Sequence, residues 1–414
     1  MCGNGNILTA LRETYRFVFL DEFQDTTTVQ FALTKASFLG SSSILTAVGD
    51  TKQRIMGWAG ALHGVFQSFH KSFDATIVKL AQNHRSRSKL VAVQSIFAAE
   101  LDPESVSALA SRPGDAAGEC RVLEFGNQNR EAEFLAELVE KVIISEPIPA
   151  EEICVLCRAR PDSFAQALIS ALKQKGIKVR VDVNRRETLS EPVSAILLDI
   201  IALMFGDNQP EAWENVNAVM AELAGDHDEQ EGARRMHQLV AFLAKQKMKM
   251  PPTTAGKEQI GQALHTCLNF LGRDRFAVLY PQYAQGGYLT EIVERLAEMI
   301  SVELPDNNWI EVVNAVKGVG AVSIMTMHKS KGLEFHTVIF LGLEDNAIWN
   351  YQRNADEETC GLFVALSRAK ERCIFTFCRG RPGRYGTPTV QTRFSIKRIF
   401  ELFNDADVNV ETIH

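Results

Sequence analysis

Short apolar runs that end in polar or acidic residues mark the first eighty positions of the chain. FVFLDE (17–22) and SILTAVGD (43–50) have this form, and TTVQFALTKASFL between them has apolar residues at helical spacing. A continuous apolar run is typical of a strand buried on both faces of a parallel sheet. The order strand, helix, strand therefore predicts an open α/β sheet, in which ligands bind beyond the carboxyl ends of the strands.

Further α/β patterns follow to about residue 185, and long helical patterns then replace them. CRVLEF and EEICVLCRA are predicted strands, whereas REAEFLAELVEKVI and DSFAQALISALKQKG predict helices, the second followed by the strand IKVRV. Between about 187 and 315 helical patterns such as PVSAILLDIIALMF dominate, and AVSIMTMH, HTVIFLGL and ERCIFTFC return as apolar strands after 320. These patterns predict an α/β protein with an α-helical block inserted into one α/β domain.

Composition changes this picture only a little. The chain has 414 residues, of which 46% are hydrophobic and 23% charged, as in globular proteins of two or three domains. No run approaches the roughly 18 apolar residues of a membrane helix, and the start lacks the pattern of a secretion signal. We therefore expect a cytoplasmic protein with no membrane partner.

Charge and cysteine spacing raise two candidate sites. The net charge is −7, yet residues 368–398 hold nine Lys or Arg against the single acid Glu371, which suits a polyanion or simply a solvated basic face. Cys154 and Cys157 form a C-x-x-C inside the apolar run ICVLC, and no second Cys or His pair completes four ligands. Reduced core cysteines in a buried strand are the better interpretation.

Five ordered blocks carry a specific resemblance. They are DEFQDT (21–26), VGDTKQRIMGWAGA (48–61), LAQNHRS (80–86), VSIMTMHKSKGLEF (322–335) and LFVALSRAK (362–370). In this order they resemble the superfamily 1 DNA helicases of the UvrD/Rep type, with DEFQDT in the place of the Walker B block. The resemblance implies parallel-sheet, RecA-like core domains with a helical insertion in the second. The implied parts are the C-terminal half of the first core domain (1–78), the second core domain (79–185 and 319–414, tail included) and the insertion (186–318).

The resemblance also implies a role for residues of the ATP site. Asp21 would hold Mg²⁺, Glu22 would act as the base that deprotonates the attacking water, and Gln53 would sense the γ-phosphate of ATP. Arg85 and Arg368 would reach that phosphate from the second core domain and stabilise charge in the transition state.

Four more residues match family positions for the nucleotide or for DNA. Glu334 would contact the ribose and His84 the adenine, where the family usually has Tyr. Trp58 would stack on bases of single-stranded DNA, and His328 would couple the nucleotide state to the DNA groove. Without the flanking motifs, Trp58 would be interpreted as a core residue and His328 as a structural histidine.

This sequence departs from the family at further positions. Met56 and Ala59 replace the usual Tyr and Arg of the third motif, and Ala59 removes a cation. Thr359 and Cys360 replace the usual arginines after the acidic pair Glu357–Glu358. We therefore expect some nucleotide and DNA contacts of the family to be weaker or absent.

The phosphate-binding loop of the family, G-x-x-x-x-G-K-[ST], does not occur in this sequence. Gly256–Lys257 is followed by Glu and lies in the helical region. Only 20 residues precede Asp21, so we expect half of the first core domain, with exposed sheet edges and apolar surface, and weak ATP binding by this chain alone.

Three functions remain open from the sequence. The first is a portion of an ATP-dependent 3′-to-5′ DNA helicase, whose polarity follows from the resemblance alone. The second is a subunit of a split helicase, in which a partner protein supplies the phosphate loop. The third is a DNA-binding module that hydrolyses nothing, motivated by Trp58 and the basic segment 368–398.

Overall fold

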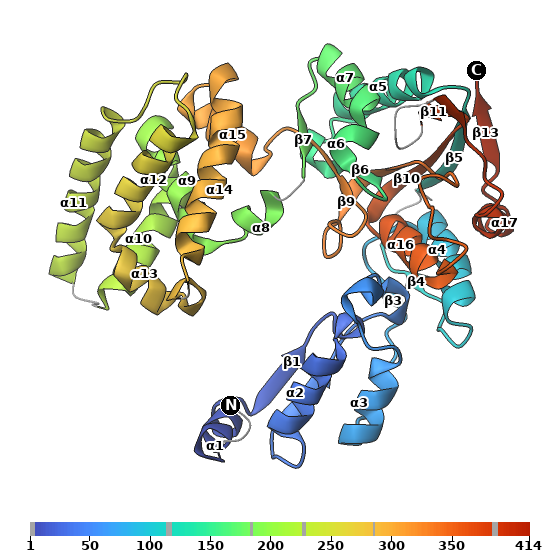
Figure 1. Cartoon of the computed structure of the whole chain (residues 1–414), viewed down its shortest axis with the longest axis horizontal. Coiled ribbons are helices and arrows are strands. Elements are labelled where there is room, and N and C mark those ends of the chain that lie inside the picture. Colours follow the sequence, from blue (N-terminus) through green and yellow to red (C-terminus); the bar gives the residue numbers. More distant parts are fainter. Residues whose placement is uncertain (1–4, 113–117, 183–184, 226–228, 285, 383–387) are drawn as a thin grey trace. The chain divides into compact units, whose positions relative to one another are not determined.

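A computed structural model of the chain describes residues 5–112, 118–182, 185–225, 229–284, 286–382 and 388–414 (Figure 1). The chain divides into two compact units. One combines Met1–Val181 with Val322–His414, and the other is Asp182–Ala321. The second unit is close to the expected insertion 186–318. No boundary between compact units falls at 78/79, so that division remains an expectation.

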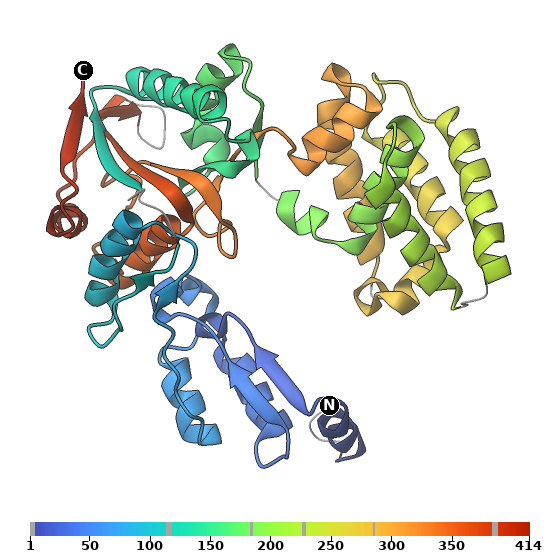
Figure 2. The same ribbon diagram turned by 180° about the vertical axis from the view of Figure 1, so that it is seen from behind.

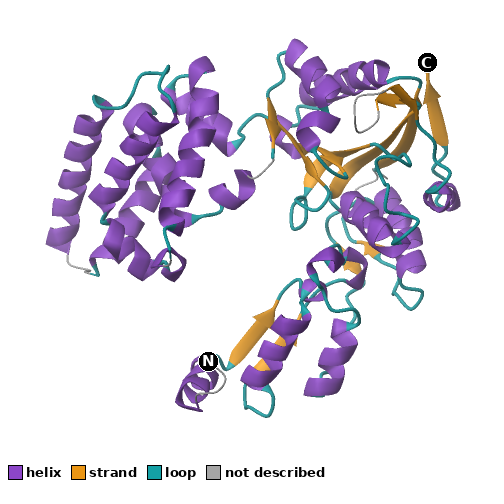
Figure 3. Cartoon of the chain, in the orientation of Figure 1, coloured by secondary structure: helices purple, strands orange, loops and turns teal. Residues whose placement is uncertain are grey.

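A seven-stranded parallel sheet forms the centre of the first unit, with helices packed against it (Figure 3). Every adjacent pair in the order β13-β5-β10-β9-β6-β8-β7 is parallel. This confirms the predicted α/β, RecA-like fold class. The strands are β5 (Glu119–Phe125), β6 (Ile153–Cys157), β7 (Val179–Val181), β8 (Val322–Thr326), β9 (Phe335–Leu341), β10 (Ala369–Cys378) and β13 (Val410–Ile413).

Both faces of this sheet are buried, which explains why its strands have continuous apolar runs. Along β6, Cys154 and Leu156 contribute to the core on one face, and Ile153 and Val155 to the core on the other. This alternation follows from the period of two along a strand. The first core is closed by α4 (Ser88–Leu101), α16 (Ala355–Ser367) and α17 (Lys397–Asp405), and the second by α5 (Gln128–Ser145), α6 (Pro161–Phe164) and α7 (Gln166–Gln174) (Figure 2).

The N-terminal part of the same unit contains a smaller parallel pair, β1 (Phe17–Leu20) and β2 (Ile44–Ala47). Leu20, Leu45 and Ala47 pack on an aromatic cluster around Phe23. The opposite face is open, because Phe17 and Phe19 are 66% and 75% exposed. The expectation that these runs are buried on both faces is therefore wrong, and the expected exposed apolar surface is present. The surrounding helices are α1 (Gly5–Thr14), α2 (Thr28–Phe38) and α3 (Val65–Phe73).

Two short pairs were not predicted, and neither was the edge strand β13. They lack the apolar runs by which the other strands were found, and their pairing depends on neighbours distant in sequence. The parallel pair is β3 (Gln82–Asn83) with β4 (Leu109–Ala110), and the antiparallel pair is β11 (Gly380–Pro382) with β12 (Pro388–Val390).

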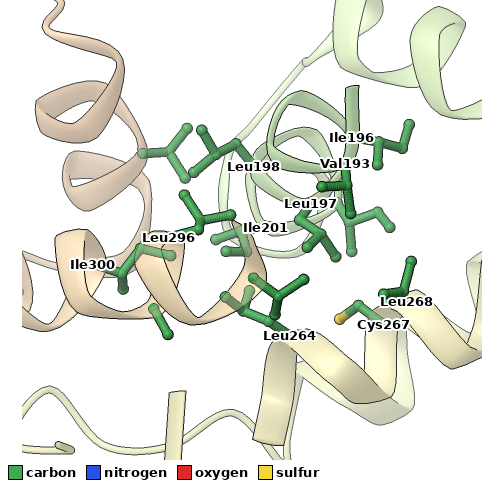
Figure 4. Packing of buried hydrophobic residues seen from close by; sticks show 14 of the residues in the cluster. Val193, Ile196, Leu197, Leu198, Ile201, Leu264, Cys267, Leu268, Leu296 and Ile300 are labelled. Atoms are coloured by element: carbon green, nitrogen blue, oxygen red, sulfur yellow. The ribbon is translucent and has the colours of Figure 1, made fainter. Parts of the chain in front are cut away.

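The second unit is helical around a single apolar core (Figure 4). The run PVSAILLDIIALMF forms α9 (Pro192–Phe205), whose Val193, Leu197 and Ile201 are fully buried, since neighbouring helices pack around it. Leu264 of α12 (Lys257–Leu271) and Leu296 of α14 (Tyr288–Glu303) meet this helix in the core. The helices are α8 (Arg185–Leu189), α9 (Pro192–Phe205), α10 (Pro210–Ala224), α11 (Glu229–Lys247), α12 (Lys257–Leu271), α13 (Arg273–Leu279), α14 (Tyr288–Glu303) and α15 (Trp309–Lys317).

A search of the described residues for a helix with the length and apolar character of a membrane span finds none.

Candidate functional site

The acid pair lies directly after β1, where the chain turns sharply. Glu22 adopts a left-handed conformation (φ 49°, ψ 38°), which costs a non-glycine residue on the order of 1 kcal/mol. The backbone N–H of Glu22 donates to Oδ1 of Asp21 over 2.8 Å. Both side chains are exposed. The turn therefore presents two carboxylates to solvent at a strand end.

Buried Gln24 joins the ends of the two strands. Its Nε2 donates to Oε2 of Glu22 over 2.6 Å, and its Oε1 accepts from the backbone N–H of Asp50 over 3.0 Å. Gly49 leaves room for this bridge. A Cβ at position 49 would clash with Oε1 of Gln24 and lie 3.0 Å from the backbone nitrogen of Phe23. The glycine after the second strand is thus required by close packing.

Gln53 is positioned by a one-turn 3-10 helix, η2 (Thr51–Gln53), that follows β2. Asp50 caps this turn: its Oδ1 accepts from the N–H of Lys52 over 3.1 Å, and its Oδ2 accepts from Nε2 of Gln53 over 3.2 Å. Because Nε2 of Gln53 donates to Asp50, the side-chain oxygen Oε1 is left to accept a hydrogen bond from another residue.

That acceptor is used by Arg368, near the end of the last block, LFVALSRAK. Arg368 is 2% exposed, and its Nη2 donates to Oε1 of Gln53 over 2.9 Å. Its remaining donors are held by the carbonyls of Val364 and Leu333, and by the hydroxyl of Ser367. Burial lowers the pKa of Arg368 to about 10, and the nearby cation of Arg85 contributes, although Glu22 and Asp50 oppose the shift. The guanidinium remains protonated at neutral pH.

Arg85 and Glu334 meet beside this contact. Nε of Arg85 donates to Oε2 of Glu334 over 2.9 Å, and its Nη1 donates to the carbonyl of Ser367 over 2.9 Å. The hydrogen bond from Arg85, with the nearby Lys370, holds the pKa of the Glu334 carboxyl below its ordinary value although partial burial opposes this.

A cleft of about 710 Å³ within the first unit collects four of the predicted residues. Gln53, His84, Arg85 and Glu334 line it, together with the unpredicted cations Lys52 and Lys370. Arg368 adjoins the cleft through Gln53. Asp21 and Glu22 line a separate hollow of about 520 Å³ beside β1. The seven residues predicted to contact ATP or its Mg²⁺ therefore lie in neighbouring spaces, and they do not line a single cavity.

Lys331 connects the acid turn to the second α/β segment. Its Nζ lies 3.0 Å from Oε2 of Glu22 and also pairs with Asp25. Partial burial raises the pKa of the Glu22 carboxyl, but the hydrogen bonds from Gln24 and Lys331 outweigh it, so the net pKa lies below the ordinary value. Glu22 is thus an ionised carboxylate, as a proton acceptor must be.

The two predicted DNA residues have contrasting environments. Trp58, in the 3-10 helix η3 (Gly57–Ala59), is 74% exposed, which excludes the core interpretation. His328 follows β8 and is partly buried. Burial, and then the charge of Arg158, lower the pKa of His328 to about 4. Its imidazole is therefore neutral at pH 7.

Carboxylate oxygens suit Mg²⁺, which binds through one or two carboxylates together with substrate phosphates and water. Asp21 and Glu22 supply such oxygens at an exposed strand end, so the donor set fits this ion. No group of three or more His, Cys, Asp or Glu able to hold a metal occurs among the described residues.

Cys154 and Cys157 are fully buried in β6, and burial raises the pKa of the Cys157 thiol to about 12.

Sequence reasoning did not single out Gln24, Asp50 or Lys331. Gln24 and Asp50 stand inside quoted blocks, DEFQDT and VGDTKQ, and Lys331 inside HKSKGLEF. Their place in those blocks was the available signal. The hydrogen bond between Gln24 and Asp50 spans 26 positions and the ion pair of Lys331 with Glu22 spans 309, and contacts of that kind form only after folding.

Protein-family models match most of the chain. The model for the UvrD/REP helicase N-terminal domain matches residues 3–74, and that for the UvrD-like helicase C-terminal domain matches 78–188 and 208–380. A probable DNA helicase II homolog of Rickettsia felis is 27% identical over 419 residues, covering 91% of this chain and 63% of that protein. The ATP-dependent DNA helicase Rep of Escherichia coli is 24% identical over 413 residues, covering 88% and 60%. The chain thus spans about three fifths of these relatives.

Proposed function

The chain belongs to the UvrD-like helicase family, and we propose that it is part of an ATP-dependent DNA helicase that moves along single-stranded DNA and unwinds duplexes. The hydrogen bond between Arg368 and Gln53 carries this proposal, because it joins the block after β2 to the block before β10. Movement in the 3′-to-5′ direction belongs to the proposal on the strength of the family resemblance.

The proposed chemistry assigns one task to each group. Asp21 would hold Mg²⁺, which when bound would neutralise phosphate charge. Glu22, kept ionised by Gln24 and Lys331, would accept the proton of the attacking water. Gln53 would contact the terminal phosphate through its amide.

The two arginines would supply positive charge to that phosphate. Arg368 is fixed by four protein acceptors, so it would lose little conformational freedom when the phosphate arrives. Arg85 would contact the phosphate only after its hydrogen bond to Glu334 is broken. Glu334 would then be available to the ribose, and exposed His84 to the base.

A subunit of a split helicase is the second candidate, and the open face of β1 and β2 favours it. Phe17, Phe19 and Ile44 expose large apolar surface there. Further polypeptide that carried the phosphate loop and covered this face would bury that surface and complete the ATP site. A DNA-binding module without hydrolysis remains the third candidate and rests on exposed Trp58.

The test is to join the 414-residue chain to the phosphate-loop segment of a UvrD-like relative and to measure ATP hydrolysis with and without single-stranded DNA. We expect DNA-stimulated hydrolysis that Glu22→Gln reduces at least about a hundredfold, whereas Glu13→Gln, an exposed carboxylate of α1, leaves it unchanged. An inert joined protein with intact Glu22 would contradict the motor. Strand binding that ignores ATP and weakens steeply with salt would support the third candidate.

A further inference from the structure

Trp349 is an exposed tryptophan that the proposed mechanism does not use. It lies between β9 and α16 in the first unit and is 57% exposed. The tryptophans of the helical unit, Trp213 and Trp309, are half-buried and buried. Trp58 and Trp349 are therefore the tryptophans that solvent reaches most readily.

An arginine is fixed against the ring of Trp349. The guanidinium carbon of Arg158 lies 5.1 Å from the ring centroid. Two nitrogens of Arg158 donate to the carboxylate of Glu358, Nε to Oε2 over 2.8 Å and Nη2 to Oε1 over 2.9 Å. The Glu358 side chain is 2% exposed, so this bidentate pair is anchored in the protein interior. Arg158 therefore supports the indole from one side, and the exposed remainder of the ring is available to a ligand.

The adjacent residue of α16 touches the loop that carries Trp58. A Cβ at Gly57 would lie 3.1 Å from Oε2 of Glu357, so the backbone before Trp58 packs closely on that carboxylate. Glu357 and Glu358 are successive residues in the first turn of α16. One turn of helix therefore contacts the Trp58 loop and the support of Trp349.

His328 belongs to the same neighbourhood. The charge of Arg158 contributes to lowering the pKa of the imidazole, which places the two side chains within electrostatic reach. The ring is neutral at pH 7, so it does not add charge to this neighbourhood. Proteins that bind single strands without sequence preference use aromatic side chains on which bases stack, and arginine stacks on aromatic faces.

We propose that Trp349 is a second base-stacking residue for single-stranded nucleic acid, supported by Arg158. The inference rests on the strand binding in the proposed function and adds a residue to it. Every base has a flat face, so the contact would be tolerant of sequence. An indole already held by Arg158 would lose little rotational freedom when a base stacks on it.

The experiment compares two fluorescent strands of equal length and charge, an oligo-dT and an abasic strand, at one salt concentration. Binding to the 414-residue chain is followed by fluorescence anisotropy. We expect Trp349→Ala to weaken oligo-dT binding about tenfold and abasic binding less than about twofold, because only the first strand can stack. Trp349→Phe, which keeps a ring, should stay within about threefold of the parent. Tyr15→Ala removes an exposed aromatic of the same unit and should change neither affinity.

The outcomes distinguish a failure of this inference from a failure of the proposed strand binding. Equal losses on both strands would show that Trp349 acts through folding or charge, and would overturn stacking. An unchanged affinity for oligo-dT, with Trp58→Ala still weakening it, would refute only the role of Trp349 and would point to a protein contact. A parent chain that binds neither strand would refute both the inference and the proposed strand binding.

Discussion

Nη2 of Arg368 donates a hydrogen bond of 2.9 Å to Oε1 of Gln53, across 315 positions of sequence. The contact has a defined direction because Asp50 accepts from the Gln53 amide and leaves the carbonyl oxygen for the arginine. An apolar contact between the same two segments supports this hydrogen bond. Ile55 is fully buried against Cys360 and Val364 of α16. The small residue at 360, where the family usually has arginine, therefore fits an apolar contact.

Gln53→Ala should impair hydrolysis without unfolding the protein. Arg368 would keep its hydrogen bonds to Val364, Leu333 and Ser367, so we expect the fold to remain intact. The substitution should instead weaken the proposed contact with the phosphate. In the protein joined to a phosphate-loop segment, we expect kcat for ATP to fall about 10- to 100-fold. Gln67→Ala on the exposed face of α3 is the matched control. A Gln53→Ala protein with parental kcat would refute the role assigned to this amide.

Gly49→Ala should disturb the acid turn from a distance. The added methyl would displace Gln24, which bridges Glu22 to Asp50, so we expect a loss of stability of about 1–3 kcal/mol together with slower hydrolysis. Urea unfolding and steady-state kinetics would measure the two effects. Gly126→Ala, where a Cβ meets nothing within 4 Å, is the control. Equal stability in urea and equal rates of hydrolysis for Gly49→Ala and Gly126→Ala would contradict the proposed clash at position 49.

The His328 ring should stay neutral far below its ordinary titration range. Its pKa is about 4 in the folded protein, against an ordinary value of 6.5. Since the unfolded chain takes up this proton first, the contribution of His328 to stability is complete above pH 6.5 and is lost as the pH falls toward 4. NMR titration of the ring should show the low midpoint. His328→Gln should lose less stability than the parent between pH 7 and pH 5; equal losses would contradict the burial of a neutral imidazole.

Breaking a buried ion-pair network should reduce the stability of the protein far more than breaking an exposed ion pair. Arg381 is enclosed between Glu131 and Glu344, with N–O distances of 2.5 Å and 2.6 Å. Arg381→Met would leave two buried carboxylates without their cation, so we expect a loss of about 3–5 kcal/mol in urea unfolding. Arg398→Ala breaks the exposed pair with Glu100 and should cost at most about 1 kcal/mol. Similar losses for the two variants would refute the contrast.

The apolar patterns predicted six of the seven strands of the main sheet, all except the edge strand β13, because a strand that is buried on both faces is largely apolar. ICVLC and ERCIFTFC form β6 and β10 as expected. The same rule was wrong for FVFL, because β1 has a cover on one face only. The local sequence shows which side chains of a strand are apolar enough to be buried. Whether other elements cover them depends on the tertiary structure.

The blocks of the chain likewise identified the family and most of the candidate site, since each block is local in sequence. The folded structure alone decided which blocks meet: that Arg368 reaches Gln53, that Lys331 pairs with Glu22, and that Arg158 supports Trp349. These contacts join residues separated by 191 to 315 positions. Their formation depends on how the sheet and helices pack, because a side chain of a few ångströms finds a distant partner only after the backbone has brought the two together.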